Sequence, residues 1–259
     1  MPIKYKFTHT IEEKERKEVK IEKSYELLNI INKSNNFKEF FFYNNDVKIY
    51  NGKISELETL FYNILKYLEI SIDRNFQLYK IINISEIQKI FNNLYTQQFS
   101  NRFLKFLHES EKILANEYEL KNLISHIPFF QIFFNCIISS KYNEVKKEYI
   151  TEEIKNIIPE MSLPLRYYLK ETVYKEKSII YKMYGKLDDI LFDFYKFMEI
   201  YKKNSKITEE LKQENFTFDI NYHIEIYKEA ELVRRCNREI EIKYCKERYI
   251  KNAYLLEEM

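Results

Sequence analysis

Two residues in the segment SNRFLKFLHES, at positions 100–110, have side chains that ribonuclease chemistry uses. Arg102 and His108 are separated by five residues, in a segment whose apolar spacing predicts the start of an amphipathic helix. A guanidinium presents a planar set of donors to a phosphate, and an imidazole can take up or release a proton near neutral pH. In the alternative interpretation, Arg102 is a surface residue and His108 lies at the edge of an apolar helix face.

The seven residues from Arg102 to His108 resemble the short motif of the HEPN ribonuclease family, in which an arginine precedes a histidine on a helix. The resemblance implies that Arg102 contacts the scissile phosphate and that His108 acts in acid–base catalysis or positioning. It also implies a helical fold and a site built from two motifs, so this chain, with one motif, would act as a dimer. Phe103 departs from the family pattern, which has a polar residue after the arginine.

A second candidate site is a basic and aromatic stretch near the C-terminus, which contains four of the eight arginines. Its candidate binding residues are Arg234, Arg235, Arg238, Lys243, Tyr244, Lys246, Arg248 and Tyr249. Such a patch can hold an RNA backbone or an acidic protein surface. Glutamates at 239, 241 and 247 dilute the charge, so the alternative is a solvated face with local ion pairs.

Carboxylates that could hold a metal ion occur twice. The first group is Asp188, Asp189 and Asp193, and the second is Asp219 and Glu225 beside His223. Paired carboxylates suit Mg²⁺, and a histidine among carboxylates suits Zn²⁺. Both groups also fit the polar side of an amphipathic element, and this second interpretation predicts no metal and no cofactor.

Glycine content excludes common nucleotide sites. The chain has two glycines, Gly52 and Gly185, among 259 residues. A Rossmann site and a P-loop both need several glycines, because backbone N–H groups must close on a phosphate. The abundance of tyrosine and phenylalanine, at 23 and 20 residues, is typical of an AT-rich genome or mobile element.

Charge and cysteine content indicate the compartment. The formal net charge is +2, which gives no global attraction for nucleic acid. Three cysteines without a CxxC pair predict a reducing compartment. The N-terminus becomes highly charged before any apolar run, so we expect no signal peptide and a cytoplasmic protein. The longest uncharged run, 122–140, contains polar residues and predicts a central buried helix rather than a membrane span.

Most of the chain has a helical pattern. We expect helices over 12–33 and from Ser55 to about Lys206, with a long one over 165–203. A stripe at alternating steps of four and three predicts a packing seam on that helix: Ile180, Tyr184, Leu187, Leu191, Phe194, Met198 and Tyr201. A short helix is expected to begin at Thr151, and another is expected over 228–237.

Strand patterns occur near both ends. Alternation predicts strands over 3–11, 216–226 and 238–244, and the aromatic run at 37–50 predicts a β-hairpin. One continuous helix over 219–254 is the alternative for the C-terminal region. The expected fold is therefore mainly α (α+β): a multi-helix bundle in a single domain, with an N-terminal region at 1–53, a central helical block at 54–206 and a C-terminal region at 207–259. Strands from both ends would form a small β-element.

The sequence assembles no evident reactive centre, so the leading hypothesis is a non-enzymatic interaction or inhibitor protein. It would bind a protein or ribonucleoprotein partner, for example a nuclease effector in bacterial or phage conflict, through aromatic and arginine side chains. RNA and a second copy of the chain are further candidate partners, and no membrane is expected. The alternative is a HEPN-like, metal-independent RNA endonuclease that acts as a dimer in bacterial defence or a toxin system.

Overall fold

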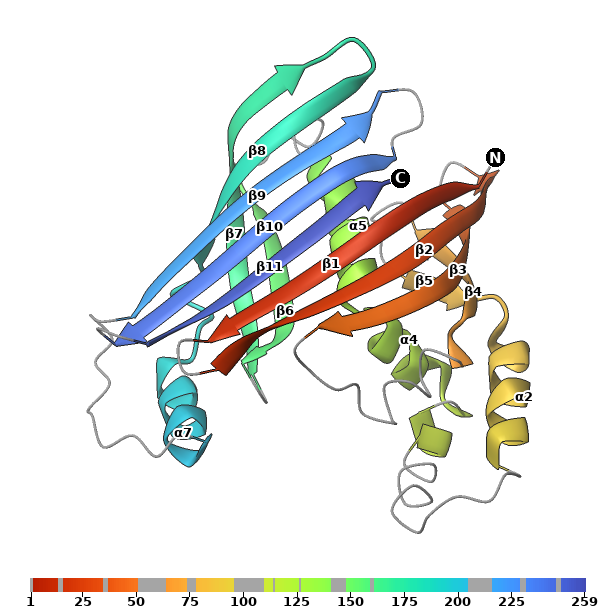
Figure 1. The fold of residues 1–259 in the computed structure, drawn as a ribbon, viewed down its shortest axis with the longest axis horizontal. Coiled ribbons are helices and arrows are strands. Elements are labelled where there is room, and N and C mark those ends of the chain that lie inside the picture. Colours follow the sequence, from red (N-terminus) through yellow and green to blue (C-terminus); the bar gives the residue numbers. More distant parts are fainter. Residues whose placement is uncertain are drawn as a thin grey trace. The chain divides into compact units, whose positions relative to one another are not determined.

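The computed structural model describes residues 2–13, 16–34, 37–50, 64–73, 78–95, 110–113, 115–125, 127–140, 148–158, 161–204, 216–228, 232–245 and 248–259. Within these ranges, eleven strands form an antiparallel sheet in the order β5-β4-β3-β2-β1-β11-β10-β9-β8-β7-β6 (Figure 1). The chain divides into two compact units. Unit 1 comprises Met1–Phe7, Glu22–Phe134 and Glu258–Met259, and unit 2 comprises Thr8–Ile21 and Asn135–Glu257.

Unit 1 combines strands with helices. Its strands are β3 (Phe37–Tyr50), β4 (Tyr67–Asp73) and β5 (Leu78–Ile81), with parts of β1 (Ile3–Glu13) and β2 (Arg16–Ser34). Its helices include α2 (Ile84–Tyr95), α4 (Glu117–Ser125) and the first half of α5 (Pro128–Ser140). The sheet pairings of β4 with β3 and β5 are antiparallel.

The core of unit 1 is aromatic. Phe129 and Phe133 lie one helical turn apart on α5, so both rings point to the same side. Phe42 on β3 meets both, with ring centroids 5.8 and 5.5 Å away, and Tyr5 on β1 meets Phe133 at 5.7 Å. These contacts between strand and helix are edge-to-face, which adds to the free energy gained by burying the rings.

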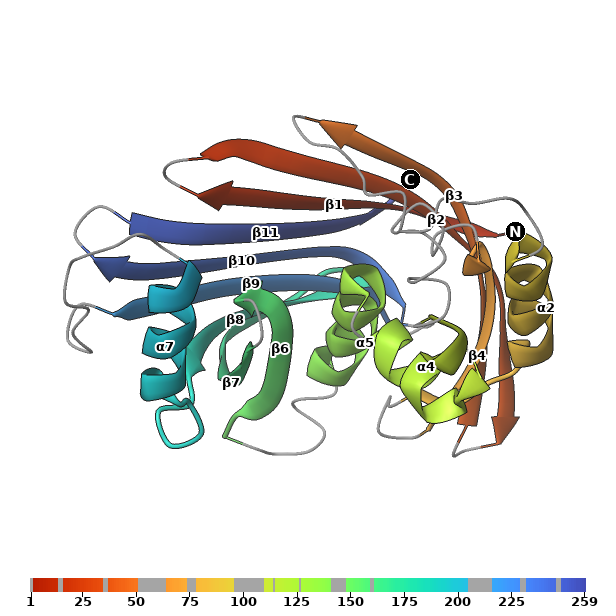
Figure 2. The ribbon, with the colours of Figure 1, turned by 90° about the horizontal axis from the view of Figure 1, so that it is seen from below.

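Unit 2 consists mainly of long strands. They are β6 (Ile150–Ile158), β7 (Met161–Tyr174), β8 (Ser178–Leu187), β9 (Thr217–Tyr227), β10 (Val233–Cys245) and β11 (Arg248–Glu258). Helix α7 (Phe194–Asn204) lies between β8 and β9 in the chain. Consecutive strands from β6 to β11 pair as antiparallel neighbours. Helix α7 lies on one side of β9 and β10 (Figure 2), where its Phe197 meets Phe216 at a centroid distance of 5.0 Å.

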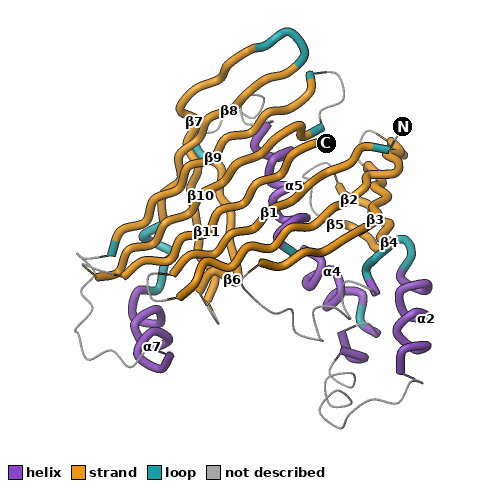
Figure 3. The backbone as a smooth tube through the Cα atoms, viewed as in Figure 1, coloured by secondary structure: helices purple, strands orange, loops and turns teal. Residues whose placement is uncertain are grey.

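The prediction of a mainly helical bundle is wrong, because strands dominate the described residues (Figure 3). The expected long helix over 165–203 is instead most of β7, then β8, a turn and α7. The predicted stripe spans a strand, a turn and a helix, so its members share no face. Strand β8 buries Tyr181 and Met183, which the stripe omits, and leaves Tyr184 exposed.

Other predicted helices are also strands. The segment 12–33 forms most of β2, and Thr151 lies in β6. The segment 228–237 enters β10 at Val233, and no continuous helix runs through the described residues of 219–254. The predicted hairpin at 37–50 is one strand, β3. The expected helix start at position 55 lies outside the described residues.

Three predicted strands are present, and one predicted helix is present in two parts. Strands over 3–11, 216–226 and 238–244 correspond to β1, β9 and β10, and β1 neighbours β11 in the sheet. The apolar run at 122–140, predicted as one central helix, is divided between the end of α4 and α5. Its rings at Phe129 and Phe133 are fully buried in the aromatic core of unit 1.

Candidate binding site

A buried ion pair lies inside unit 2. Arg238 is fully buried on β10, and its Nη1 donates to Glu152 Oε1 of β6 at 2.7 Å. The guanidinium also lies over the rings of Tyr254 and Tyr222, 5.0 and 5.7 Å from their centroids. Its Nε and Nη2 have no hydrogen-bond partner among the described residues. Strand alternation explains this position, because Arg238 shares its face with the buried Cys236 and Ile240.

Burial and charge shift the pKa values in this cluster. Burial disfavours the charge on Arg238, but the Glu152 carboxylate and the surrounding tyrosines together outweigh it and raise the pKa of the guanidinium. Burial raises the pKa of Tyr254 to about 12, although Arg238 acts in the opposite direction. Burial and the nearby Glu152 carboxylate also raise the pKa of Tyr167, whose hydroxyl makes no well-formed hydrogen bond to a described residue. The cluster is therefore an internal charge centre rather than a surface patch.

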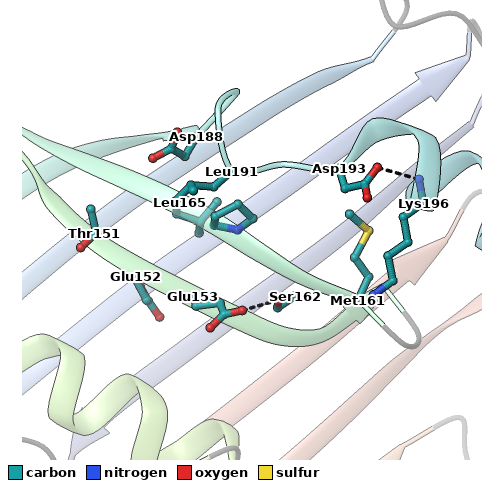
Figure 4. Close-up of a pocket in the computed structure, with 11 residues that line it drawn as sticks. Thr151, Glu152, Glu153, Met161, Ser162, Leu165, Asp188, Leu191, Asp193 and Lys196 are labelled. Atoms are coloured by element: carbon teal, nitrogen blue, oxygen red, sulfur yellow. Dashed lines mark hydrogen bonds between the residues drawn. The ribbon is translucent and has the colours of Figure 1, made fainter.

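Next to this cluster, unit 2 contains a pocket of about 550 Å³ (Figure 4). Its walls come from β6, β7, the loop after β8, and α7. The polar lining residues are Thr151, Glu152, Glu153, Ser162, Asp188, Asp193 and Lys196. Four carboxylates and one ammonium make this acidic pocket attractive to cations. No histidine or cysteine is among its described lining residues.

Most carboxylates of the acidic pocket already have partners within the chain. Asp188 accepts two hydrogen bonds from Arg166, at 2.7 Å from Nε and 2.9 Å from Nη2. Burial opposes the charge on Asp188, but these bonds and the Ile190 amide outweigh it and lower the pKa of the carboxyl. Glu153 accepts from Ser162, as Figure 4 shows. These pairings fix the pocket walls and leave little uncompensated charge for chemistry.

A row of three tyrosines lies on the opposite face of β6, β7 and β8 from the buried Leu165 and Tyr167. This tyrosine ladder consists of Tyr149, directly before β6, Tyr168 on β7 and Tyr184 on β8. Tyr168 and Tyr184 are paired in register, and their rings stack with centroids 5.1 Å apart and planes 17° apart. The ring centroids of Tyr149 and Tyr168 are 5.9 Å apart. Alternation along each strand places all three on one face.

Two cationic side chains lie beside the tyrosine ladder. Arg166 lies over the Tyr149 ring, with its guanidinium carbon 4.9 Å from the centroid, and Lys186 Nζ lies 6.0 Å from the Tyr184 centroid. Arg166 on β7 and Lys186 on β8 are directly opposite each other in the strand register. Tyr184 is 39% exposed. The ladder thus presents aromatic surface with positive charge beside it.

A second hollow, of about 510 Å³, lies beside Tyr184. We call it the Tyr184 hollow. Its polar lining residues are Tyr184, Lys186, Asp189, Asp219, Asn221 and Glu241. Asn221 on β9 is the register partner of Tyr184, and Asp219 is the partner of Glu241 on β10. Close by, a Cβ at Gly185 would lie 3.0 Å from Ile220 Cβ and 3.1 Å from Tyr167 Cδ1, so a larger residue there would require buried neighbours to shift.

The predicted basic patch is dispersed in the structure. Arg234 and Arg235 are exposed and pair with Glu225 and Glu257, and Lys243 pairs with Glu241 at 3.4 Å. The prediction of a surface role for Arg238 has to be corrected, since this residue is fully buried. Tyr249 donates its hydroxyl to Glu12. The side chains of Tyr244, Lys246 and Arg248 lie outside the described portion of the structure.

The other candidate residues are separated or undescribed. Arg102 and His108 both lie outside the described residues. In the first acidic group, Asp188 pairs with Arg166, while Asp193 accepts from the Lys196 amide at 2.9 Å and caps α7. In the second, Glu225 pairs with Ser178 and Lys175. Within the described ranges, no group of three or more His, Cys, Asp or Glu side chains is arranged to hold a metal ion.

Sequence reasoning misses the tyrosine ladder, because it places Tyr168 and Tyr184 on a helix. The available signal is alternation: the segment MSLPLRYY buries Met161, Leu163 and Leu165 at every second position. A strand there puts Tyr168 on the other face. Pairing with Tyr184 then depends on the β7–β8 register, which a single segment does not reveal.

The fold and site define an antiparallel β-sheet protein with an aromatic row on one sheet face. No protein-family description and no curated protein match the chain. Among solved structures, it is similar to a lipovitellin chain from a study of lipid–protein interactions, with 10% identity and a TM-score of 0.48. The match covers 100% of this chain but only 25% of that chain, and a likeness this weak does not assign a function. None of the described helices is both long and apolar enough to cross a membrane.

Proposed function

We propose that this chain is a non-enzymatic binding protein that engages a protein partner through the tyrosine ladder. The carrying observation is the outward stack of Tyr168 on Tyr184 with Arg166 and Lys186 alongside. Tyrosine and arginine are enriched where proteins bind one another, because a rigid ring supplies contact area at a low entropy cost. Stacked rings are already ordered, so little further freedom is lost when a partner covers them.

The charges of the acidic pocket support a binding role over a catalytic one. A catalytic acid or base needs a proton that it can exchange with substrate, and an accessible position. Asp188 is held in its charged form by Arg166, and Glu152 pairs with the buried Arg238. These carboxylates are engaged in ion pairs within the fold, and the exposed Tyr184 at the end of the ladder remains as surface available to a partner.

Site-specific photo-cross-linking tests this proposal. A photoreactive phenylalanine analogue replaces Tyr184 in one protein and Tyr174 in a matched control, because Tyr174 is also an exposed tyrosine, at 69%. We expect a cross-linked protein of defined mass from position 184 and none from position 174. Tyr168→Ala in the position-184 protein should reduce the yield severalfold, since the supporting ring is lost.

Two results would contradict the proposal. One is equal cross-linking from both positions, which indicates non-specific contact. The other is cleavage of labelled single-stranded RNA by the unsubstituted protein but not by His108→Ala, which would establish a ribonuclease.

A further inference from the structure

We infer that the Tyr184 hollow receives an arginine side chain of the partner protein, an inference that rests on the proposed function and deepens it. The hollow has one aromatic wall and a surplus of negative charge. Three carboxylates line it, from Asp189, Asp219 and Glu241, against one ammonium from Lys186. The occupant should therefore be cationic and have a flat surface that matches a ring.

The aromatic wall is available on one side only. Tyr168 covers the face of Tyr184 that is directed toward β7, with the two planes 17° apart. The opposite face is directed toward β9, where Asn221 is the register partner and the hollow begins. A planar group that enters the hollow can continue the stack of the ladder.

Of the two carboxylates that line the hollow from β9 and β10, one has no ion pair within the described portion of the chain and the other has a long one. Asp219 has no ion pair or hydrogen bond there, and Glu241 forms its ion pair with Lys243 at a long 3.4 Å. Asp219 and Glu241 are register partners on one sheet face, so their side chains start from neighbouring strands about one strand spacing apart. Two carboxylates at this separation suit the forked donors of a guanidinium.

At the Tyr149 end of the ladder, the chain itself already combines an arginine with a tyrosine ring and a carboxylate. There, the Arg166 guanidinium lies over Tyr149 and donates two hydrogen bonds to Asp188. The Tyr184 side has the ring and the carboxylates, but the cation that the chain places by this ring is the Lys186 ammonium, at 6.0 Å. An arginine from the partner protein would form at the Tyr184 end the same combination that Arg166 forms at the Tyr149 end.

Charge also decides between a protein and a nucleic acid. A nucleobase could stack on Tyr184, but its phosphates would approach three carboxylates at close range. An arginine side chain gains from the same carboxylates. The hollow therefore favours a basic protein segment over single-stranded RNA.

The test titrates three short peptides into the full chain and needs no partner. Acetyl-Gly-Arg-Gly-amide is the probe, and the matched peptides contain lysine or citrulline in place of arginine. Citrulline has the planar shape of arginine without its charge. Nitrogen-15 NMR follows the Asn221 side-chain amide and the backbone amides of Gly185 and Ile220, which all line the hollow.

We expect saturable shifts with the arginine peptide, about threefold weaker binding of the lysine peptide, and no saturable binding of the citrulline peptide. Asp219→Asn should weaken arginine binding about fivefold, because a charge-assisted hydrogen bond is lost. Glu176→Gln is the control, since it removes an exposed carboxylate at the β7–β8 turn. Lys186→Ala should strengthen binding, because it removes the competing cation.

Equal binding of the citrulline and arginine peptides would overturn the inference, and so would an Asp219→Asn variant that binds as tightly as the unsubstituted chain. Tighter binding of uridine monophosphate than of the arginine peptide would also overturn it. The two proposals fail separately. Cross-linking from position 184 without arginine binding refutes the inference alone, and arginine binding without cross-linking refutes the proposed function alone.

Discussion

Unit 1 packs rings from helix α5 against rings from its strands, whereas unit 2 encloses an ion pair of an arginine and a glutamate among tyrosines. Phe42 and Phe133 represent the first interior, and Arg238 and Glu152 the second. The first gains free energy from removing apolar surface from water, without charge. The second must compensate the loss of hydration of two ions with one 2.7 Å hydrogen bond and nearby rings. Unit 2 is therefore the unit whose stability should depend on charge.

The largest effect should come from removing a ring in unit 1. Phe42→Ala deletes a side chain that meets Phe129, Phe130 and Phe133 at centroid distances of 5.1 to 5.8 Å. We expect a loss of about 4 kcal/mol in the free energy of unfolding, because a cavity remains where the ring was. Urea denaturation measures the loss, and hydrogen exchange should increase in β3, β4 and α5 more than in β7–β10.

Tyr118→Ala is the control for this change, because Tyr118 is a 69% exposed aromatic residue of the same unit. It should change the free energy of unfolding by less than about 0.5 kcal/mol. If exchange in β7–β10 rose as much as in β3, the contrast between the two interiors would be lost.

A smaller but still large effect should follow when the buried pair is broken. Glu152→Gln keeps an acceptor for Arg238 but leaves the cation uncompensated, so we expect a loss of about 3 kcal/mol in the free energy of unfolding, measured by urea denaturation. Glu153→Gln is the control on the neighbouring position, where the carboxylate accepts from Ser162 at the surface. Replacing both partners, as Glu152→Leu with Arg238→Met, should recover much of the loss. A double variant less stable than Glu152→Gln would show that the pair itself stabilises unit 2.

Strands are predictable from the sequence where one face is apolar and the other polar. In β9, Ile220, Tyr222 and Ile224 are buried and alternate with exposed polar residues, so the period of two is unambiguous. In β7 and β8 both faces carry aromatic residues, and the steps of four and three in the stripe match a helix by coincidence. Tertiary pairing with neighbouring strands decides the structure there, and local periodicity does not contain it.

The site is less predictable than the fold. Alternation predicts a strand at 238–244, but charge alone assigns Arg238 to the surface, because its partner Glu152 lies 86 positions away in the chain. The same holds for Asp188, a candidate metal ligand by sequence that instead pairs with Arg166. In both cases a cation and an anion meet across strands, and only the register brings them together.

The smallest effect that separates the two interiors should appear at alkaline pH. Burial raises the pKa of Tyr254 to about 12, against an ordinary value of 10.0 in the unfolded chain. The folded state therefore keeps its proton while the unfolded state loses it. The contribution of the protonated Tyr254 hydroxyl to the free energy of unfolding is complete below pH 10 and is lost as the pH rises toward 12.

We expect Tyr254→Phe to remove about 2 kcal/mol of this alkaline loss, measured as the free energy of unfolding at about pH 9 and about pH 11.5. Tyr174→Phe, at an exposed position, should leave the loss unchanged. If Tyr254→Phe lost as much stability as the unsubstituted chain over this range, the tyrosines around Arg238 would not couple the interior of unit 2 to pH.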